Sequence, residues 1–464
     1  METLSNVQKQ VFEKYLLNEN IFISGPGGSG KTYLINFIYN HAIENNKSIK
    51  VCALTGCASI LLGCKATTIH RFAGIGLANK SIDEVVNSLF KKSQDKDKYN
   101  YKLRQWYSLK VLIVDEVSMM SLKLLLILDK IARRIYNKPK LPFGGLQVIF
   151  SGDFYQLPPV NSDNEGPEAS MFCFEHQLWF ELFPKENNIV LDTIFRQKDE
   201  KFLKVLNYVR EGRISVSTKK ILEDRLCSKE KLDNIRKSKV ITIISPHRKE
   251  VDNINNNSYK ELPQDAEKKS YAIKYIKLNT KNATIDSMLS LMELDDNSIK
   301  YEYEFMANNI MADKVIELKV GTYVMCIANV ALDSVNPIVN GSQGIIVGFK
   351  DGLPLVKFNN IDEPVVVSYY NWTSEKNKKL AVSQIPLVYA WAITIHKSQG
   401  VTLNDAIIDI GKNIFEYGQT YVALSRVKSL DGLYLTSFDY NKIMANPKVK
   451  QFYNNIKNKI DIQK

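Results

Sequence analysis

The stretch Ile21–Thr32, which reads IFISGPGGSGKT, constrains this chain more than any other. A short apolar run predicts a buried strand, and the loop that follows fits the pattern G-x-x-x-x-G-K-[ST]. In such loops backbone N–H groups converge on phosphate oxygens, the lysine reaches the β- and γ-phosphates, and the hydroxyl helps to hold Mg²⁺. A helix from Thr32 to about Asn45 would point its positive end at the same anion. The order strand, loop, helix predicts an α/β domain that binds a nucleoside triphosphate through Gly25, Pro26, Gly27, Gly28, Ser29, Gly30, Lys31 and Thr32.

Apolar runs alternate with amphipathic segments along the first part of the chain. Helical spacing of apolar side chains predicts a helix over Met119–Tyr136. Alternation of this kind is typical of a mostly parallel sheet with helices on both faces. The polar, lysine-rich stretch Gly74–Tyr107 is expected to be a small insertion. The strands of this first domain, residues 1–189, are predicted at Ile21–Ser24, Lys50–Ala53, Val111–Val114 and Gln147–Ser151.

A second α/β domain, residues 190–464, is predicted from a further set of apolar runs. Its sheet is expected to contain Val240–Ile244, Ala406–Ile410 and Leu433–Thr436. Residues about 323–370 differ, because short β-branched runs there are separated by the turn signals Asn340-Gly341 and Asp351-Gly352. The pattern predicts a small β-barrel or β-sheet module inserted into the second domain, with strands at Tyr323–Ile327, Gly344–Phe349, Leu353–Phe358 and Pro364–Tyr369.

Two adjacent carboxylates, Asp115 and Glu116, end the apolar run VLIV. A strand that ends in Asp-Glu is often only a solvated strand end, but here it follows a phosphate loop in the same domain. The pair suits a division of labour in which Asp115 holds Mg²⁺ and Glu116 polarises the attacking water. The sequence therefore predicts a site that hydrolyses a nucleoside triphosphate with Mg²⁺.

Three further polar residues are candidates whose spacing alone leaves them open. Gln156, in SGDFYQLPPV, could sense the γ-phosphate or simply belong to a turn. Arg196 in LDTIFRQ and Arg426 in YVALSRV could supply positive charge to the developing phosphate charge, or belong to surface ion pairs.

The chain carries a formal net charge of +12, from 62 Lys and Arg against 50 Asp and Glu. Such an excess favours a polyanionic partner, because basic side chains release counterions from a phosphate backbone. No apolar stretch is long enough to span a bilayer, and the start METLSNVQKQVF does not resemble a signal peptide. The six cysteines form no C-x-x-C pair, so reduced thiols in an intracellular compartment are expected rather than a metal site, although Cys52, Cys57 and Cys64 lie close together.

Long ordered blocks give the chain a family resemblance. They include LSNVQKQVF, GPGGSGKT, LTGCASILLGCKATTIHRFAGIG, VLIVDEVSM and PFGGLQVIFSGDFYQLPPV. The later half adds LDTIFRQKDEKF, ELKVGTYVMCIANV, IVNGSQGIIVGF, AWAITIHKSQGVTL and YVALSRVKSLDGLYL. Together these blocks resemble the Pif family (petite integration frequency) of superfamily 1 DNA helicases, which is related to RecD-type enzymes, over nearly the whole chain.

The resemblance implies two RecA-like P-loop NTPase lobes, with a small insertion in lobe one and a β-barrel-like insertion in lobe two. It implies that the nucleotide is ATP and that Gln8 contacts its adenine, that Gln156 couples nucleotide state to motion, and that Arg196 and Arg426 are arginine fingers from the second lobe. Gln399 and Gly400 would lie near the lobe interface, and the single-stranded DNA track would be lined by Thr68, His70, Phe72, His396, Lys397 and Ser398. Phe72 could equally be a core residue, and either histidine could be a packing residue.

The activity implied is ATP-dependent 5′→3′ translocation on single-stranded DNA with unwinding of duplex and forked DNA, in replication, repair or recombination. The expected molecule is monomeric or assembles on DNA, and the nucleus, mitochondrion and viral or cytoplasmic sites of replication are not distinguished. An RNA or RNA–DNA hybrid helicase, a nucleotide-switched remodeller without unwinding, and an inactive helicase are the alternatives. The chain departs from the family at Leu54 and Cys57, and it begins almost directly at Gln8, so roles of a long N-terminal extension are not carried over.

Overall fold

The computed structural model divides the chain into two compact units. The first contains Met1–Ile214, Glu416–Val422 and Ile443–Lys464, and the second contains Ser215–Phe415 and Ala423–Lys442. The structure describes residues 4–62, 64–75, 80–90, 103–159, 166–197, 199–277, 296–328, 330, 338, 340–359, 361–374 and 379–457. In these parts of the chain, no helix is long and apolar enough to cross a membrane.

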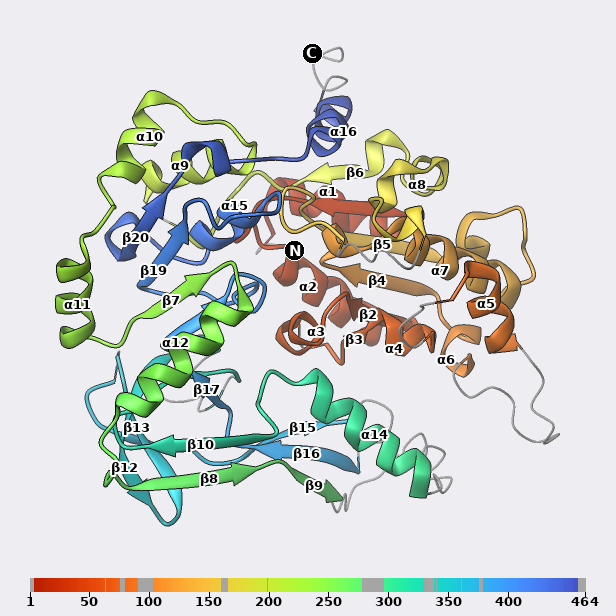
Figure 1. The fold of residues 1–464 in the computed structure, drawn as a ribbon. Helices are drawn as coiled ribbons and strands as arrows, with labels where there is room; N and C mark the ends of the chain where they lie inside the picture. Colours follow the sequence, from red (N-terminus) through yellow and green to blue (C-terminus); the bar gives the residue numbers. More distant parts are fainter. Residues whose placement is uncertain are drawn as a thin grey trace. The chain divides into compact units, whose positions relative to one another are not determined.

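The first unit is built on a six-stranded parallel sheet with the order β3-β2-β4-β5-β1-β6 (Figure 1). The four predicted strands are all present, and β6 and β3 lie at the two edges. The bounds are β1 Ile21–Ser24, β2 Ile49–Ala53, β3 Thr67–Thr68, β4 Val111–Asp115, β5 Gln147–Gly152 and β6 Asn188–Val190.

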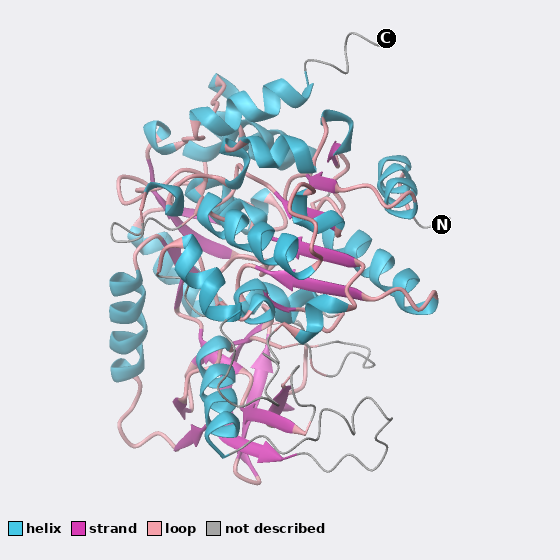
Figure 2. Ribbon diagram, turned by 90° about the vertical axis from the view of Figure 1, so that its right-hand side faces the viewer, coloured by secondary structure: helices cyan, strands magenta, loops and turns pink. Residues whose placement is uncertain are grey.

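Helices cover both faces of this sheet, as the alternation of apolar runs predicts (Figure 2). The predicted helix over 119–136 is present as α7. The α-helices of the unit are α1 Asn6–Leu16, α2 Lys31–Glu44, α3 Gly56–Leu62, α4 Ile69–Ala73, α5 Ile82–Phe90, α6 Arg104–Tyr107, α7 Leu122–Ile135, α8 Gln177–Leu182, α9 Glu200–Arg210 and α16 Pro447–Lys457. Short 3₁₀ turns are η1 Val117–Met119, η2 Pro142–Gly145, η3 Pro167–Ala169, η4 Cys173–Glu175 and η5 Lys185–Asn187. Helices α5 and α6 lie in the expected insertion at 74–107, of which residues 76–79 and 91–102 lie outside the described residues.

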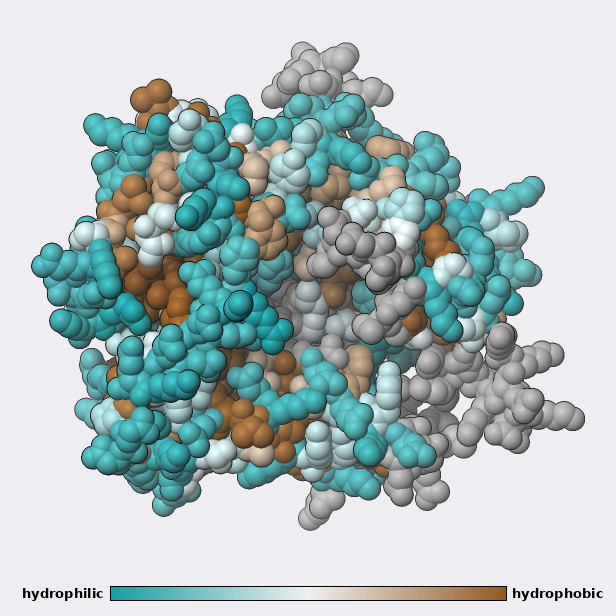
Figure 3. All heavy atoms as spheres, in the orientation of Figure 1, coloured by the Kyte–Doolittle hydropathy of each residue, from teal (hydrophilic) through white to brown (hydrophobic). Residues whose placement is uncertain are grey.

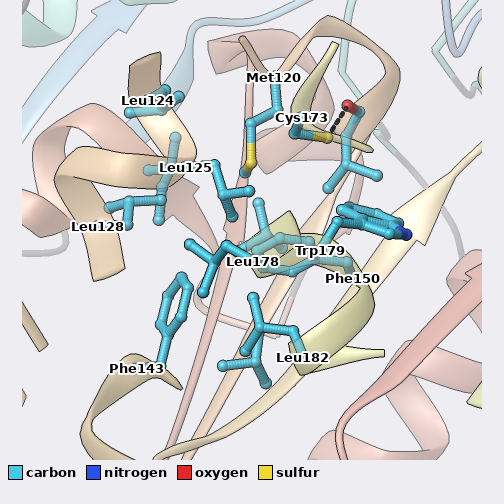
Figure 4. Packing of buried hydrophobic residues seen from close by; sticks show 14 of the residues in the cluster. Met120, Leu124, Leu125, Leu128, Phe143, Phe150, Cys173, Leu178, Trp179 and Leu182 are labelled. Carbon is cyan, nitrogen blue, oxygen red and sulfur yellow. Dashed lines mark hydrogen bonds between the residues drawn. The ribbon is translucent and has the colours of Figure 1, made fainter. Parts of the chain in front are cut away.

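Successive residues of the central strands enter two different cores. In β4, Val111 and Ile113 pack with α1 and α2, whereas Leu112 and Val114 pack with the helices of the opposite face. Figure 4 shows the second core, where Phe150 of β5 lies among Leu125 of α7 and Leu178 and Trp179 of α8. Burial of both strand faces fixes the register of the sheet and hence the place of the strand ends.

The first unit extends beyond the boundary expected at residue 189. Strand β6 pairs in parallel with β1, and the backbone N–H of Leu191 donates to the carbonyl of Ser24 at 2.8 Å. The following segment, including α9, stays with this unit up to Ile214. The boundary therefore falls about 25 residues later, because the apolar run near Val190 is the last strand of the first sheet and not the first strand of the second.

The second unit combines a parallel sheet with antiparallel strands. The four-stranded parallel sheet has the order β18-β7-β19-β20, with β7 Thr242–Ser245, β18 Ala392–Thr394, β19 Ala406–Ile410 and β20 Leu433–Phe438. Its helices are α10 Val216–Glu223, α11 Lys229–Ser238, α12 Arg248–Glu261 and α14 Asp296–Asn309. Helix α15 Gln419–Leu424 begins in the first unit and ends in the second, and η6 Leu430–Gly432 and η7 Tyr440–Lys442 follow it.

On the face seen in Figure 3, hydrophilic side chains alternate with smaller hydrophobic areas.

The β-rich module is present and is longer than predicted. A five-stranded antiparallel sheet contains the four predicted strands and β17: β11 Tyr323–Cys326, β12 Gln343–Lys350, β13 Leu353–Phe358, β14 Val365–Val366 and β17 Leu387–Tyr389. Asp351 and Gly352, both with positive φ, form the predicted turn between β12 and β13. Two smaller antiparallel sheets use strands that precede or follow the predicted module in the chain. One pairs β8 Lys268–Ala272 with β10 Val315–Lys319. The other pairs β9 Lys274–Lys277 with β16 Leu380–Gln384, which also pairs with β15 Tyr370–Thr373.

Candidate active site

The phosphate loop connects the end of β1 to the start of α2. Gly28 and Gly30 have φ of 85° and 83°, a region that residues with a side chain rarely adopt. A Cβ on Gly28 would lie 2.5 Å from the Cβ of Arg196, and one on Gly30 would lie 2.8 Å from Nε2 of Gln8. Among the described residues, no side chain caps the first turn of α2. The N-terminus of α2 is therefore not capped by a side chain and can receive an anion.

Lys31 lies at the first position of α2 and is turned back onto the loop. Its ammonium donates to the carbonyls of Gly25 at 2.7 Å and Pro26 at 3.1 Å. Burial lowers the pKa of Lys31, and the carboxylates of Asp153, Glu116 and Asp115 oppose that shift. Three carboxylates thus lie near the Lys31 ammonium, which is expected to bind the phosphates of the nucleotide.

Asp115 and Glu116 lie at the carboxyl end of β4, as predicted. Asp115 is 6% exposed, and its Oδ1 atom is buried with no hydrogen-bond partner among the described residues. Burial raises the pKa of Asp115, while the Ser151 hydroxyl and the Lys31 ammonium act in the opposite sense. A buried carboxylate oxygen without a partner, beside the loop that carries the exposed Thr32, fits a Mg²⁺ ion, which prefers carboxylate and hydroxyl oxygen ligands.

The turn after β4 is held in an unusual conformation. Glu116 has φ of 58° and ψ of 37°, the left-handed region, and η1 begins directly after it. Strand β5 ends alongside at Gly152, where a Cβ would lie 2.9 Å from the backbone nitrogen of Val117. Close contact between the two strand ends therefore sets the direction of Glu116, at a cost of order 1 kcal/mol in backbone strain.

Asp153, directly after β5, is a residue whose importance the sequence alone did not reveal. Its carboxylate is fully buried and receives two hydrogen bonds from the guanidinium of Arg210 in α9, from Nε and Nη2, each at 2.8 Å. The backbone N–H of Gln156 donates to the carbonyl of Asp153 at 2.8 Å. The buried ion pair thus holds the turn that carries the predicted phosphate sensor Gln156.

Arg196 lies in the first unit, and this corrects its assignment to the second lobe. The segment after β6 crosses the phosphate loop, where the backbone N–H of Phe195 donates to the carbonyl of Gly28 at 2.8 Å. Arg196 is next to Gly28 in space, and its Nη1 is buried with no hydrogen-bond partner among the described residues. Burial lowers its pKa, with Tyr421 and Glu116 opposing. A buried guanidinium nitrogen that has no partner among the described residues, beside the loop, fits an anionic phosphate.

Gln8 and Phe195 lie at the same end of α2. Gln8 is buried, completes a capping box with Ser5 at the start of α1, and donates to the carbonyl of Gly30 at 3.4 Å. Phe195 is 57% exposed, and its ring lies 3.3 Å from where a Cβ of Gly30 would be. Phe195 was not among the predicted residues, and its one signal in the sequence is that it directly precedes the candidate Arg196.

Tyr421 of α15 is a second residue that sequence reasoning missed. Its hydroxyl accepts a hydrogen bond from the backbone N–H of Gly27 at 3.0 Å, and the side chain is 3% exposed. It belongs to the segment Glu416–Val422 that packs in the first unit. A protein hydroxyl therefore takes one of the loop amides that a phosphate would use.

The residues of IHKSQG and Arg426 lie together in the second unit. Arg426 is 2% exposed, with Nη1 donating to the carbonyl of Ser398 at 3.3 Å and Nη2 to the hydroxyl of Ser425 at 2.7 Å. His396 and Lys397 are exposed just after β18, and Gln399 and Gly400 follow in the same turn. Ser398 is buried, and its hydroxyl donates to the carbonyl of Ile395. Its side chain is therefore not available to DNA, contrary to the expectation from the sequence.

The predicted DNA residues of the first unit separate into two kinds. Thr68 caps α4 by accepting from the N–H of Arg71, and His70 is half-buried on the same short helix. Phe72 is 3% exposed, and its ring lies 4.6 Å from that of Trp106 in the core. Phe72 is therefore a core residue and not a base-stacking one, because its spacing on α4 points it into the sheet.

Comparison with known proteins gives consistent matches. A model of the PIF1-like helicase family matches residues 3–220. The curated protein ATP-dependent DNA helicase PIF1 of Danio rerio is 33% identical over 98% of this chain, and this chain spans 64% of that protein's length. The yeast protein ATP-dependent DNA helicase RRM3 is 30% identical over 94% of this chain and 65% of its own length.

The solved structures agree with these matches along the whole chain. The crystal structure of Pif1 helicase from Candida albicans has a TM-score of 0.69 and 30% identity, covering 98% of this chain and 100% of that one. Bacteroides Pif1 in complex with ADP-AlF4 has a TM-score of 0.75 and 26% identity, covering 98% and 97%. From the family match, this full-length structural likeness and the geometry of the phosphate loop, we conclude that the chain belongs to the PIF1-like helicase family.

Proposed function

We propose that this protein is an ATP-dependent DNA helicase that moves along single-stranded DNA and separates duplex DNA. The observation that carries the proposal is the grouping, in one compact unit, of the phosphate loop, the Asp115–Glu116 strand end and the half-buried Arg196. The names of the curated relatives and the ADP-AlF4 complex of Bacteroides Pif1 support ATP as the nucleotide.

The residues of the first unit divide the work of hydrolysis. Backbone N–H groups of Gly25–Thr32 and the ammonium of Lys31 bind the phosphates once Lys31 leaves the carbonyls of Gly25 and Pro26. Asp115 and Thr32 would hold Mg²⁺, which neutralises phosphate charge when bound. Glu116 orients the attacking water, and Arg196 stabilises charge that develops on the transferred phosphoryl group.

A purine base fits the pair Gln8 and Phe195. The amide of Gln8 can both donate and accept, which suits the edge of adenine, and the exposed face of Phe195 suits stacking. We assign adenine to this pair because both side chains meet at Gly30, one residue before Lys31.

Arg426 and the DNA contacts complete the proposal. Arg426 is the second arginine finger, and the hydrogen bond from its guanidinium to the carbonyl of Ser398 fixes its position in the second unit. The exposed His396 and Lys397 contact the DNA backbone, as do Thr68 and His70 in the first unit. The net charge of +12 supplies a sequence-independent and salt-dependent attraction to DNA.

The decisive experiment compares unwinding of duplexes that carry a 5′ or a 3′ single-stranded tail, with matched DNA and RNA strands. We expect strand separation of the 5′-tailed DNA duplex, with ATP and Mg²⁺, and none with Lys31→Ala. Preferential unwinding of RNA would make the protein an RNA helicase. ATP hydrolysis stimulated by DNA without any strand separation would make it a remodeller.

A further inference from the structure

Tyr453 of the C-terminal helix α16 lies in the middle of the nucleotide-binding unit, although it is 422 positions after Lys31 (453 minus 31). Its side chain is 2% exposed. Its hydroxyl shares a 2.6 Å hydrogen bond with the hydroxyl of Ser24 and accepts one from the backbone N–H of Phe154 at 3.2 Å. Figure 1 shows α16 close to the C-terminal end of the chain.

The hydroxyl has a third, longer contact, with Oδ1 of Asp153 at 3.5 Å. Its other two partners, Ser24 and Phe154, follow neighbouring strands. Ser24 is the last residue of β1 and directly precedes Gly25 of the phosphate loop, whereas Phe154 follows β5 and leads to Gln156. Strands β1 and β5 are adjacent, with Ser24 opposite Gly152. A single hydroxyl therefore joins the segment that binds phosphate to the segment that carries its predicted sensor.

The ring of Tyr453 is fixed as firmly as its hydroxyl. It stacks on Tyr155 with centroids 4.8 Å apart and an angle of 10° between the planes. The guanidinium of Arg210 lies 4.7 Å from the centre of Tyr155 and 5.5 Å from that of Tyr453, while it binds Asp153. Burial raises the pKa of Tyr453 further above neutral pH, where a phenol is already protonated.

The rest of α16 anchors the tyrosine to the core of the unit. Phe452 stacks on Phe174 with centroids 4.4 Å apart and contacts Phe154 at 5.3 Å. Val449 and Ile456 are buried in the same hydrophobic cluster. A helix held by so much apolar surface presents its hydroxyl in one position, which is what a positioning group requires.

We propose that Tyr453 is a positioning residue for ATP hydrolysis. Its side chain holds the phosphate loop and the Asp153–Gln156 turn in the relative positions that hydrolysis requires. It acts on the site through Ser24, Phe154 and Asp153. The inference rests on the proposed ATPase activity and adds that the C-terminal helix is part of the catalytic unit. It follows that the site depends on a segment outside the residues 3–220 that match the family model.

The test is Tyr453→Phe in the full chain, which keeps the stacked ring and removes only the hydroxyl. Loss of the hydroxyl leaves the Phe154 N–H and the Ser24 hydroxyl without this buried partner. We expect kcat for DNA-stimulated ATP hydrolysis to fall about fivefold to twentyfold, with KM for ATP changed less than about twofold. Ser24→Ala should reproduce part of the effect, because it removes only the hydrogen bond between Ser24 and Tyr453. The double variant should be no worse than Tyr453→Phe alone, because Tyr453→Phe already breaks that bond.

Tyr136→Phe is the matched control. Tyr136 is also a tyrosine of the first unit whose hydroxyl is hydrogen-bonded, donating to the carbonyls of Trp106 and Leu109 at 2.5 and 3.1 Å. It lies at the end of α7 and not at a strand end that forms the site. This variant should lower Tm by an amount similar to Tyr453→Phe and leave kcat unchanged.

Four outcomes decide the proposal. An unchanged kcat in Tyr453→Phe overturns it, as does an equal loss of kcat in Tyr136→Phe, which would indicate general destabilisation. If Tyr453→Phe does not fold, Ser24→Ala decides: a normal kcat overturns the proposal and a reduced kcat supports it. A wild-type protein that binds but does not hydrolyse ATP refutes the proposed function itself, which is a separate result.

Discussion

The hydroxyl of Tyr421 accepts a hydrogen bond from the backbone N–H of Gly27, at a distance of 3.0 Å. A phosphate group that binds the loop through Gly27 must displace this hydroxyl. The side chain of Tyr421 therefore competes with nucleotide for one amide, in the same way that the carbonyls of Gly25 and Pro26 compete with phosphate for Lys31.

Tyr421→Phe removes that competitor and keeps the ring. We expect the variant to bind ADP and ATP about twofold to tenfold more tightly, the value of one net hydrogen bond. Titration with a fluorescent nucleotide gives the Kd directly. Weaker binding would mean that the hydroxyl supports the loop instead of occupying it, and Tyr417→Phe, at an exposed tyrosine four residues earlier, is the control.

Lys31→Ala removes the only side-chain cation that the phosphate loop itself contributes. We expect ATP hydrolysis to fall by about two to three orders of magnitude, because a charge aimed at the developing phosphate charge is lost. Lys9→Ala, on the exterior of α1, should leave turnover unchanged. Steady-state hydrolysis with saturating single-stranded DNA measures both, and a Lys31→Ala protein with wild-type kcat would disprove the site assignment.

Asp115→Asn should separate stability from activity. Burial raises the pKa of Asp115, so the folded protein without ligand pays to keep this carboxyl ionised. The neutral amide should raise the free energy of unfolding by about 1 kcal/mol at neutral pH while hydrolysis is lost. Thermal unfolding without nucleotide measures the first effect and phosphate release the second.

The pH dependence of that difference follows from the sign of the shift. An acid whose pKa is raised on folding destabilises the folded state only when the pH is above its pKa in the unfolded chain. The stability difference between Asp115→Asn and wild type should therefore shrink as the pH falls towards the pKa of this carboxyl in the unfolded chain, and disappear below it. A difference in free energy of unfolding that persists below that pKa would contradict the burial argument.

Arg426→Ala tests the second unit. We expect nucleotide affinity to stay within about twofold and kcat to fall by roughly three orders of magnitude, as for loss of an arginine finger. Arg426→Lys should restore little, because a lysine cannot reproduce the two donors that reach Ser398 and Ser425. Nucleotide binding and single-turnover hydrolysis are measured on the same preparation, and wild-type hydrolysis in Arg426→Ala would remove the finger role.

Local patterns predicted the phosphate loop, the Asp115–Glu116 strand end and the parallel strands other than β3, β6 and β18, because each depends on adjacent residues. Helix α7 and the hairpin at Asp351-Gly352 were predicted for the same reason. The β-rich module was predicted at the correct place in the chain but with too few strands. Strands β8, β9 and β10 were missed because they pair only with strands remote in sequence.

What the sequence could not reveal are the contacts between distant segments. Arg196 was assigned to the wrong unit, because only the pairing of β6 with β1 shows where the first sheet ends. Ser398 was expected near DNA, and burial excludes its side chain. Phe72 was left open between a DNA contact and a core residue, and burial decides for the core. Tyr421, Tyr453 and Arg210 were missed, because each reaches the site from an element remote in sequence.

Arg210→Gln tests the buried pair beneath the Gln156 turn. The variant leaves the carboxylate of Asp153 fully buried without its guanidinium, and breaking such a pair costs about 3–5 kcal/mol. We expect a large fall in the urea midpoint of the first unit's unfolding. Lys130→Gln removes the ion pair with Asp83 at 2.8 Å, which is solvent-exposed, and should cost less than about 1 kcal/mol. Equal midpoints for the two variants would show that Arg210 and Asp153 contribute no more to stability than a surface pair, and Asp153 would then hold the turn without its arginine.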